Sequence, residues 1–152
     1  MRYKTDSAAM VYLLRQKNGQ TQVLLQQRGG VIFGAGLWEA SAAGHVDEGE
    51  SMTACAIRET NEEIGVGFDK LDIVFTSIIH ANLGDPYTPY YNGHFFVDKF
   101  RGEPKICECD KCNCLKWFDI KSLPPNMFSD RREAIQNFLD KKSYSEVGWK
   151  KL

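Results

Sequence analysis

Short apolar runs separated by turn-forming residues predict several β-strands along this chain. Two of them, Ala8–Arg15 and Gln22–Arg28, flank a polar stretch that contains the pair Asn18-Gly19. An Asn-Gly pair between two apolar runs is typical of a β-hairpin. Three later runs of the same kind predict strands at Leu71–His80, Tyr91–Phe100 and Leu115–Phe118.

Two other segments have the spacing of helices. Ser51–Gly65 contains no proline and no internal glycine, and its first and last residues suit a helix N-cap and a C-terminal stop. Asp130–Lys142 carries apolar residues at helical spacing with charged residues between them, which predicts an amphipathic helix. Because strands and helices alternate without a repeat or a linker, we expect one α/β domain over residues 1–152.

The composition narrows the choice of partner. The 152 residues are 43% hydrophobic, enough for one core, and the net charge is -1. Such a chain has no basic surplus for a nucleic-acid backbone, and none of its apolar runs reaches the roughly 18 residues of a membrane span. The first residues lack the apolar stretch of a secretory signal. We therefore expect a cytoplasmic protein that binds a small molecule or another protein.

Four of the five cysteines, Cys107, Cys109, Cys112 and Cys114, lie within eight residues. Four thiolates could hold a zinc ion, but structural zinc sites usually draw on two separated pairs of ligands. The alternation of cysteine with other residues is instead the spacing of a strand, whose side chains point to opposite faces in turn. We expect reduced thiols leading into the Leu115–Phe118 strand, without zinc.

Acidic residues recur inside the first predicted helix. At about 100° per residue, Glu59, Glu62 and Glu63 fall within an arc of about 100°. Arg58 is their one basic neighbour in the helix. Carboxylate oxygens suit Mg²⁺ and Mn²⁺, and these ions in turn bind substrate phosphates. A solvated charged face would have the same spacing, so the pattern alone leaves both interpretations open.

Eight residues around this helix stand at fixed intervals: Gly44, Glu50, Arg58, Glu59, Glu62, Glu63, Gly65 and Val66. They resemble the Nudix box, G-x5-E-x7-R-E-U-x-E-E-x-G-U with U aliphatic. Thr60 stands where an aliphatic residue is usual, and we expect it to face the packed side of the helix. Eight fixed positions make the motif specific. The resemblance to the Nudix hydrolase family implies an α/β/α sandwich with a mixed β-sheet.

The resemblance also implies an activity and a metal site. Nudix hydrolases cleave a nucleoside diphosphate linked to another moiety, with Mg²⁺ or, in its place, Mn²⁺. By family position, Glu59 and Glu63 are metal ligands, Glu62 is a ligand or the general base, and the carbonyl of Gly44 completes the shell. A metal held by these oxygens would neutralise the phosphates and supply a deprotonated water.

Other residues have weaker signals for catalysis or binding. Arg58 would hold Glu50 or another box carboxylate by a forked hydrogen bond, or would simply offset the acidic repulsion. Asp130 would either accept from a base or serve the start of the last helix, and we favour the helix start. Five residues are candidate substrate contacts: Arg28, Phe33, Trp38, His45 and Phe128. The alternative for each is a purely structural place on the surface or in the core.

Several functions remain to be separated. The substrate could be a damaged nucleoside triphosphate such as 8-oxo-dGTP, or a nucleotide sugar such as ADP-ribose. A related activity, isopentenyl diphosphate isomerase, needs a cysteine within the segment WEASAAGH, where Glu39–Ala43 supplies none. A non-catalytic nucleotide-binding Nudix regulator would usually have lost box carboxylates, and this chain keeps them all.

Overall fold

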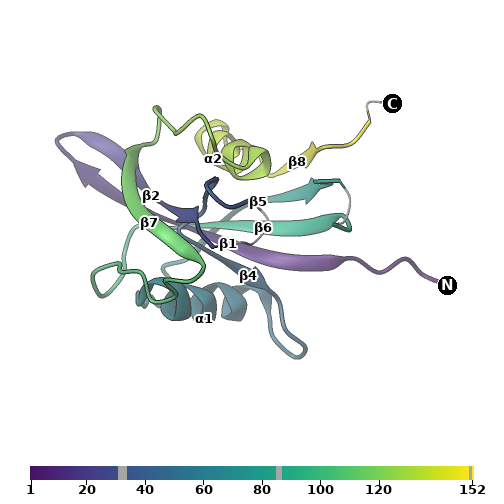
Figure 1. The fold of residues 1–152 in the computed structure, drawn as a ribbon, viewed down its shortest axis with the longest axis horizontal. Coiled ribbons are helices and arrows are strands. Elements are labelled where there is room, and N and C mark those ends of the chain that lie inside the picture. Colours follow the sequence, from purple (N-terminus) through teal and green to yellow (C-terminus); the bar gives the residue numbers. More distant parts are fainter. Residues whose placement is uncertain (31–33, 85–86, 151) are drawn as a thin grey trace.

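The chain folds into three layers, with a mixed β-sheet between two helices (Figure 1). The computed structural model describes residues 1–30, 34–84, 87–150 and 152. The strands are β1 (Asp6–Lys17), β2 (Gln20–Arg28), β3 (Trp38–Glu39), β4 (Ala42–His45), β5 (Val74–Ala81), β6 (Tyr90–Val97), β7 (Cys112–Asp119) and β8 (Tyr144–Val147). The helices are α1 (Met52–Ile64) and α2 (Ser129–Asp140). This architecture confirms the predicted α/β/α sandwich.

Strand β1 organises the sheet, whose main order is β3-β2-β1-β6-β5-β8. One edge of β1 pairs in parallel with β6. The opposite edge is divided, because Ala8–Val11 pair with β4 and Leu14–Lys17 pair with β2. At the division, the Ser41 hydroxyl accepts from the Leu13 N–H (2.9 Å) and donates to the Leu24 carbonyl (2.5 Å). A single buried serine therefore ties β1 to β2 where the edge changes partners.

Both faces of β1 are buried, which explains its continuous apolar sequence. Alternate residues of a strand point to opposite faces. Met10 and Tyr12 pack into the cluster that α2 covers through Ile135. Val11 and Leu13 pack into the cluster that α1 covers. The two helices thus cover opposite faces, as Figure 1 shows.

The ends of α1 follow from the predicted capping chemistry. The Ser51 side chain accepts from the Ala54 N–H, and the Gly65 N–H donates to the Asn61 carbonyl. Gly65 has a φ of 68°, a left-handed conformation that glycine adopts without steric cost. Thr60 is buried on the packed side and bonds to the Ala56 carbonyl. The predicted helix and the predicted place of Thr60 are both confirmed.

The strand predictions are partly confirmed. The hairpin turn has positive φ at Asn18 and Gly19, as a type I′ turn requires. Strand β5 begins at Val74, since Leu71 stands in an exposed turn. Three of the described strands were not predicted, namely β3, β4 and β8. Each has two to four residues, which are too few to show the alternation of apolar and polar positions.

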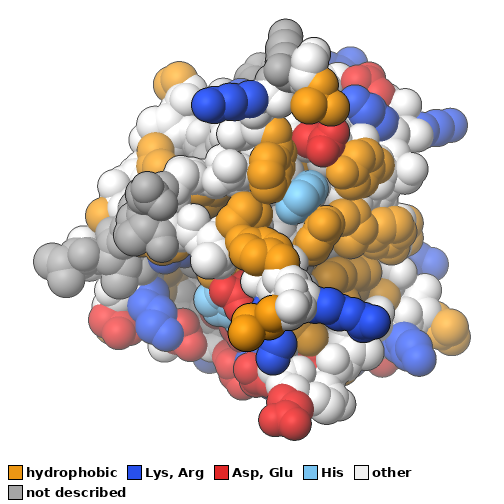
Figure 2. Space-filling view, turned by 90° about the vertical axis from the view of Figure 1, so that its right-hand side faces the viewer, with side chains coloured by type: hydrophobic (Ala, Val, Ile, Leu, Met, Phe, Trp, Pro, Cys, Tyr) orange, Lys and Arg blue, Asp and Glu red, His pale blue; other side chains and the backbone are white. Residues whose placement is uncertain are grey.

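Aromatic side chains remain exposed on the far edge of the sheet. His80 stacks on Tyr91 with 4.2 Å between ring centroids, and the ring centroids of His80 and Trp149 are 4.5 Å apart. Tyr91, Trp149 and Tyr144 of β8 all keep substantial exposure. Figure 2 shows hydrophobic side chains gathered on this side of the molecule. Neither of the described helices has the length and apolar character needed to cross a membrane.

Candidate functional site

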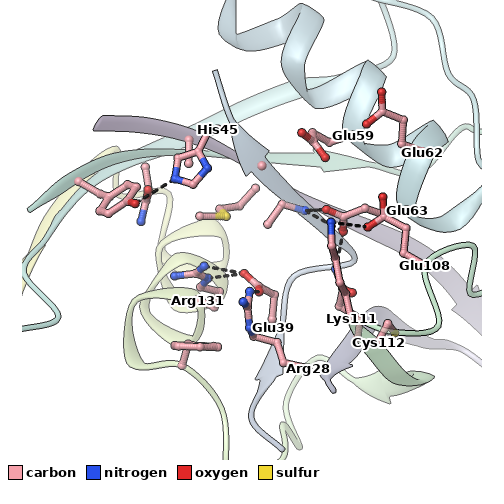
Figure 3. A pocket seen from close by; sticks show the side chains of 18 of the residues that line it. Arg28, Glu39, His45, Glu59, Glu62, Glu63, Glu108, Lys111, Cys112 and Arg131 are labelled. Carbon is pink, nitrogen blue, oxygen red and sulfur yellow. Dashed lines mark hydrogen bonds and ion pairs between the residues drawn. The ribbon is translucent and has the colours of Figure 1, made fainter. Parts of the chain in front are cut away.

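A cavity of about 740 Å³ opens where the edge of β1 divides (Figure 3). Residues from six strands and both helices line it. Carboxylates from α1 occupy one end, and a buried arginine and glutamate occupy the other (Figure 3). The lining residues used below are Ala8, Met10, Gln26, Arg28, Glu39, Ala43, Gly44, His45, Glu59, Glu62, Glu63, Tyr87, Tyr90, Asn92, Glu108, Lys111, Cys112, Phe128 and Arg131.

Glu59 packs directly on the backbone of Gly44. A Cβ added at Gly44 would overlap the Glu59 carboxyl group, so a side chain at position 44 would displace that carboxylate. The Gly44 carbonyl already accepts a long contact from the Cys55 thiol (3.5 Å). Glycine at this position therefore brings a backbone carbonyl and a carboxylate together at the cavity wall.

Arg58 holds the acidic residues in place from outside the cavity. Its guanidinium makes a forked hydrogen bond to Glu50, with distances of 2.8 and 2.9 Å. It also donates to Glu59 (2.8 Å) and, at 3.4 Å, to Glu62. Bonding to Arg58 is the main cause that lowers the pKa of Glu50 to about 2. Arg58 thus both orients a box carboxylate and offsets repulsion among the others.

Glu63 lies deeper than the other acids of α1. Its carboxylate accepts from the Gln26 amide (2.8 Å) and from the Ala43 N–H (3.3 Å). Burial raises the pKa of Glu63 to about 8, and the nearby charges of Glu39 and Glu59 act in the same direction. A bound cation would favour the ionised carboxylate, so the site is poised to exchange a proton for a metal ion.

The donors around Gly44 suit a hard divalent cation. Carboxylate and carbonyl oxygens from Gly44, Glu59 and Glu63 are the chemical type that Mg²⁺ binds. Across the part of the chain that the structure describes, no three His, Cys, Asp or Glu side chains are already grouped to hold an ion. Arg58 and Gln26 hold the carboxylates instead. Both carboxylates keep lone pairs beyond these bonds, so Glu59 and Glu63 could coordinate a metal while Arg58 and Gln26 orient them.

A buried ion-pair network forms the opposite end of the cavity. Glu39, only 1% exposed, accepts from Arg28 (2.8 Å) and from Arg131 (2.9 Å). Arg131 also donates to Asp130 at 2.7 Å, and Asn92 donates to the same carboxylate at 3.1 Å. Two acids and two arginines leave the network neutral. Asp130 thus stands in the first turn of α2, as predicted, but is fully buried in this network.

Phe128 connects this network to the apolar part of the cavity. The Arg131 guanidinium lies 4.8 Å from its ring centroid, and the Arg28 guanidinium lies 5.9 Å from it. Both distances fall within the range of a cation–π contact. The ring lines the cavity together with Tyr87 and Tyr90. Tyr90 in turn bonds to His45 at 2.9 Å.

The structure brings most of the predicted site residues to one place. Gly44, His45, Glu59, Glu62, Glu63, Arg28 and Phe128 all line the cavity. Glu50 and Arg58 stand behind it and act through contacts to Glu59 and to each other. Trp38 does not reach the cavity, because it packs edge-on against Phe118 in the core and is only 9% exposed. The predicted contact Phe33 lies outside the described residues.

Several cavity residues escaped prediction from sequence. Glu39 and Arg131 find each other only through the fold, 92 positions apart in the chain. Gln26 lies on β2, directly after the apolar run Val23–Leu25 and before two further polar residues. Glu108 and Lys111 stand within the cysteine-rich run, whose spacing predicts a strand but not that these two side chains line the cavity. The charges of these two residues, set among closely spaced cysteines, are the feature of the sequence that could have identified them.

The cysteine-rich run divides between a loop and a strand. Cys112 and Cys114 belong to β7, with exposed Asn113 between them, which confirms strand spacing for this pair. Cys107 and Cys109 precede the strand and are exposed. Burial raises the pKa of the Cys112 thiol, which lines the cavity.

Comparison with known proteins agrees with this geometry. The family model of the NUDIX domain matches residues 4–138. The chain is 33% identical over 139 residues to isopentenyl-diphosphate Delta-isomerase 2 of Photorhabdus laumondii, covering 86% of this chain and 75% of that protein. It is 28% identical over 123 residues to a Bacillus subtilis protein named as an 8-oxo-dGTP diphosphatase, covering 80% and 73%.

A solved structure shares the fold. The crystal structure of a MutT NUDIX hydrolase from Burkholderia pseudomallei superimposes with a TM-score of 0.76 at 22% identity, covering 89% of this chain and 98% of the other. The Nudix box, the three-layer fold and the family model agree. The chain therefore belongs to the NUDIX domain family and is a Nudix hydrolase that acts on a diphosphate bond.

Proposed function

We propose that this chain hydrolyses a nucleoside diphosphate linked to another moiety, with Mg²⁺ as the cofactor and Mn²⁺ as a substitute. One observation carries the proposal: three carboxylates of α1 line one end of a 740 Å³ cavity whose other end holds Arg28 and Phe128. That volume falls in the range of small-ligand sites. An acidic end suits a metal-bound diphosphate, and the opposite end suits the group attached to it.

The chain's own residues divide the work. Glu59, Glu63 and the Gly44 carbonyl are the proposed metal ligands, and Arg58 and Glu50 fix the orientation of Glu59. When bound, the metal neutralises the phosphate oxygens and lowers the pKa of the attacking water. Glu62 is the proposed general base or a further ligand, as its side chain is half exposed and, among the described residues, is held only by a long contact to Arg58.

The residues beyond the acids favour a planar substituent on the diphosphate. Ala8 and Met10 add apolar surface to the cavity, and Phe128 and Tyr87 line it as aromatic rings. Aromatic rings stack on nucleobases in a sequence-tolerant way. Arg28 lines the cavity beside Glu39 and Phe128, where its guanidinium can meet a phosphate oxygen. A damaged nucleoside triphosphate is our first candidate, because one relative is named as an 8-oxo-dGTP diphosphatase. ADP-ribose is the second.

Isomerisation of isopentenyl diphosphate is the competing activity, because a relative is named for it. That reaction needs a cysteine in the segment before the box. Ala43 lies there, lines the cavity and carries no thiol. Cys112 does line the cavity, but it comes from β7 rather than from that segment. We therefore place hydrolysis ahead of isomerisation.

The test is a panel of nucleotides, ADP-ribose and isopentenyl diphosphate, each incubated with Mg²⁺ and analysed for products. We expect hydrolysis of at least one nucleoside diphosphate derivative and no allylic isomer. Glu63→Gln should remain folded and lose at least about a hundredfold in turnover, because a preorganised charge is removed. Glu48→Gln, which changes an exposed acid outside the cavity, is the matched control. Full activity in folded Glu63→Gln would contradict the proposal.

A further inference from the structure

The loop before β7 brings cysteines to the wall of the cavity. We call residues 107–112 the cysteine loop. It places Glu108, Lys111 and Cys112 at the cavity, where Figure 3 shows them beside Glu63. Its backbone is anchored at the end of β2, because the N–H of Gly29, the residue after that strand, donates to the Lys111 carbonyl at 2.9 Å. A chemical change in this loop would therefore alter the wall of the cavity.

The backbone of the cysteine loop forms a single helical turn. The Glu108 carbonyl accepts from the Lys111 N–H (3.0 Å) and from the Cys112 N–H (3.1 Å). Cys109 and Cys112 are three residues apart across this turn. Cys112 is the first residue of β7, and its N–H closes the turn; across such a turn, residues three apart have Cβ atoms about 5–6 Å apart. A small adjustment would bring that separation to the roughly 3.5–4.5 Å of a disulfide.

The other described cysteines are less suited to pair. Cys112 and Cys114 are alternate residues of a strand, so about 6.7 Å of extended backbone separates them. Cys107 is held at the end of α1, because its N–H donates to the Glu63 carbonyl (3.0 Å). Its sulfur lies 3.4 Å from the Cβ position of Gly65, also at that end. Cys55 is fully buried inside α1.

We propose that Cys109 and Cys112 form a C-x-x-C redox pair that a peroxide oxidises to a disulfide. Exposed Cys109 attacks the peroxide as a thiolate, an O–O bond breaks, and water leaves, giving a sulfenic acid. The Cys112 sulfur then attacks the Cys109 sulfur and expels the hydroxyl as a second water. Two thiols and one hydrogen peroxide thus become one disulfide and two waters.

The disulfide would change the wall of the cavity. Cys112 is 6% exposed and pairs with Arg28 in the β2–β7 ladder, where the register already shifts. Bridging to Cys109 pulls the Cys112 sulfur toward the loop and closes a ring around Asp110 and Lys111. We expect about tenfold lower turnover in the oxidised protein, because small displacements of site residues have large effects on rate. This consequence rests on the proposed hydrolysis, whereas the disulfide does not.

The sequence allows a direct test of the pairing. Trypsin cuts after Lys111, between the two cysteines, and so separates residues 106–111 from residues 112–116. After treatment with hydrogen peroxide and blocking of free thiols, these two peptides should remain joined, and dithiothreitol should release them. Cys109→Ser and Cys112→Ser should each abolish the joined pair. Cys107→Ser and Cys114→Ser should both retain it.

Other outcomes would overturn the pairing. Bridges within either tryptic peptide, or a joined pair that survives in Cys109→Ser, would assign the disulfide elsewhere. One equivalent of tightly held zinc with unreactive thiols would replace the redox pair by a metal site. Peptide mapping needs no substrate, so a missing disulfide and a failed hydrolysis assay are separate results. A mapped disulfide with unchanged turnover on an identified substrate would refute the effect on the cavity.

Discussion

Acidification should weaken the fold through His94, a histidine buried in β6. Burial lowers the pKa of His94 from 6.5 to about 3, with Asp130 opposing and Arg131 reinforcing this shift. Its Nδ1 bonds to the Tyr12 hydroxyl at 2.9 Å, and its Nε2 has no hydrogen-bond partner among the described residues. A proton added to the folded chain would therefore place a poorly paired charge in the core.

The sign and size of the effect follow from the two pKa values. Between pH 6.5 and about 3, unfolded His94 holds a proton that the folded side chain lacks, so stability falls as the pH drops through this window. Each unit is worth about 1.4 kcal/mol. At about pH 5, which is roughly 1.5 units below the unfolded value, the loss is about 2 kcal/mol.

Urea unfolding followed by tryptophan fluorescence at pH 7 and pH 5 measures this loss. The wild-type protein should lose about 2 kcal/mol more than His94→Gln between the two conditions, because glutamine does not titrate. His80→Gln, which changes a half-buried histidine on the neighbouring strand, is the matched control and should keep the wild-type loss. Equal losses in the wild-type protein and His94→Gln would refute the argument.

Three further predictions concern the cavity. Gly44→Ala should lower Mg²⁺-dependent turnover at least about tenfold, because the added methyl group displaces Glu59. Gly67→Ala is the control, because position 67 has ordinary space for a methyl group, and it should keep full turnover. Equal turnover in the two variants would contradict the role of Gly44. Glu39→Gln should cost about 3 kcal/mol in chemical unfolding, because Asp130 alone would then face the charges of Arg28 and Arg131. An unchanged midpoint would show that the pair is not stabilising. Hydrolysis should require an added divalent ion and increase at alkaline pH, because the attacking water must lose a proton, and activity that survives exhaustive chelation would exclude this.

Local chemistry made much of α1 and the acidic end of the cavity predictable. Ser51 and Gly65 specify the ends of the helix through bonds to residues three or four positions away. The box acids are placed by the same helical period, so their convergence could be inferred before any tertiary contact was known. The Arg58–Glu50 bond was also within reach, because both residues have fixed positions in the box.

Long-range contacts explain what the sequence did not reveal. Glu39 and Arg131 meet only after β3 and α2 have packed, and neither residue has a periodic pattern to mark it. Trp38 follows a glycine-rich loop, where an aromatic residue could equally face a ligand or the core. The contact with Phe118 of β7 decides for the core, and that pairing depends on the order of strands.

The two hydrogen bonds of the Ser41 hydroxyl lie where two groups of strands diverge from β1. On one side of this point, β4 carries Gly44; on the other, β2 and β3 carry Arg28 and Glu39. Because Ser41 links β1 to β2 where these groups of strands diverge, we expect the width of the cavity between Gly44 and Glu39 to depend on the angle between them. Substitutions that alter this angle would change the size of substrate that the cavity accepts, even where the substituted residue makes no contact with the substrate. Selectivity can thus evolve from a fully buried position whose hydroxyl bonds to backbone atoms of β1 and β2.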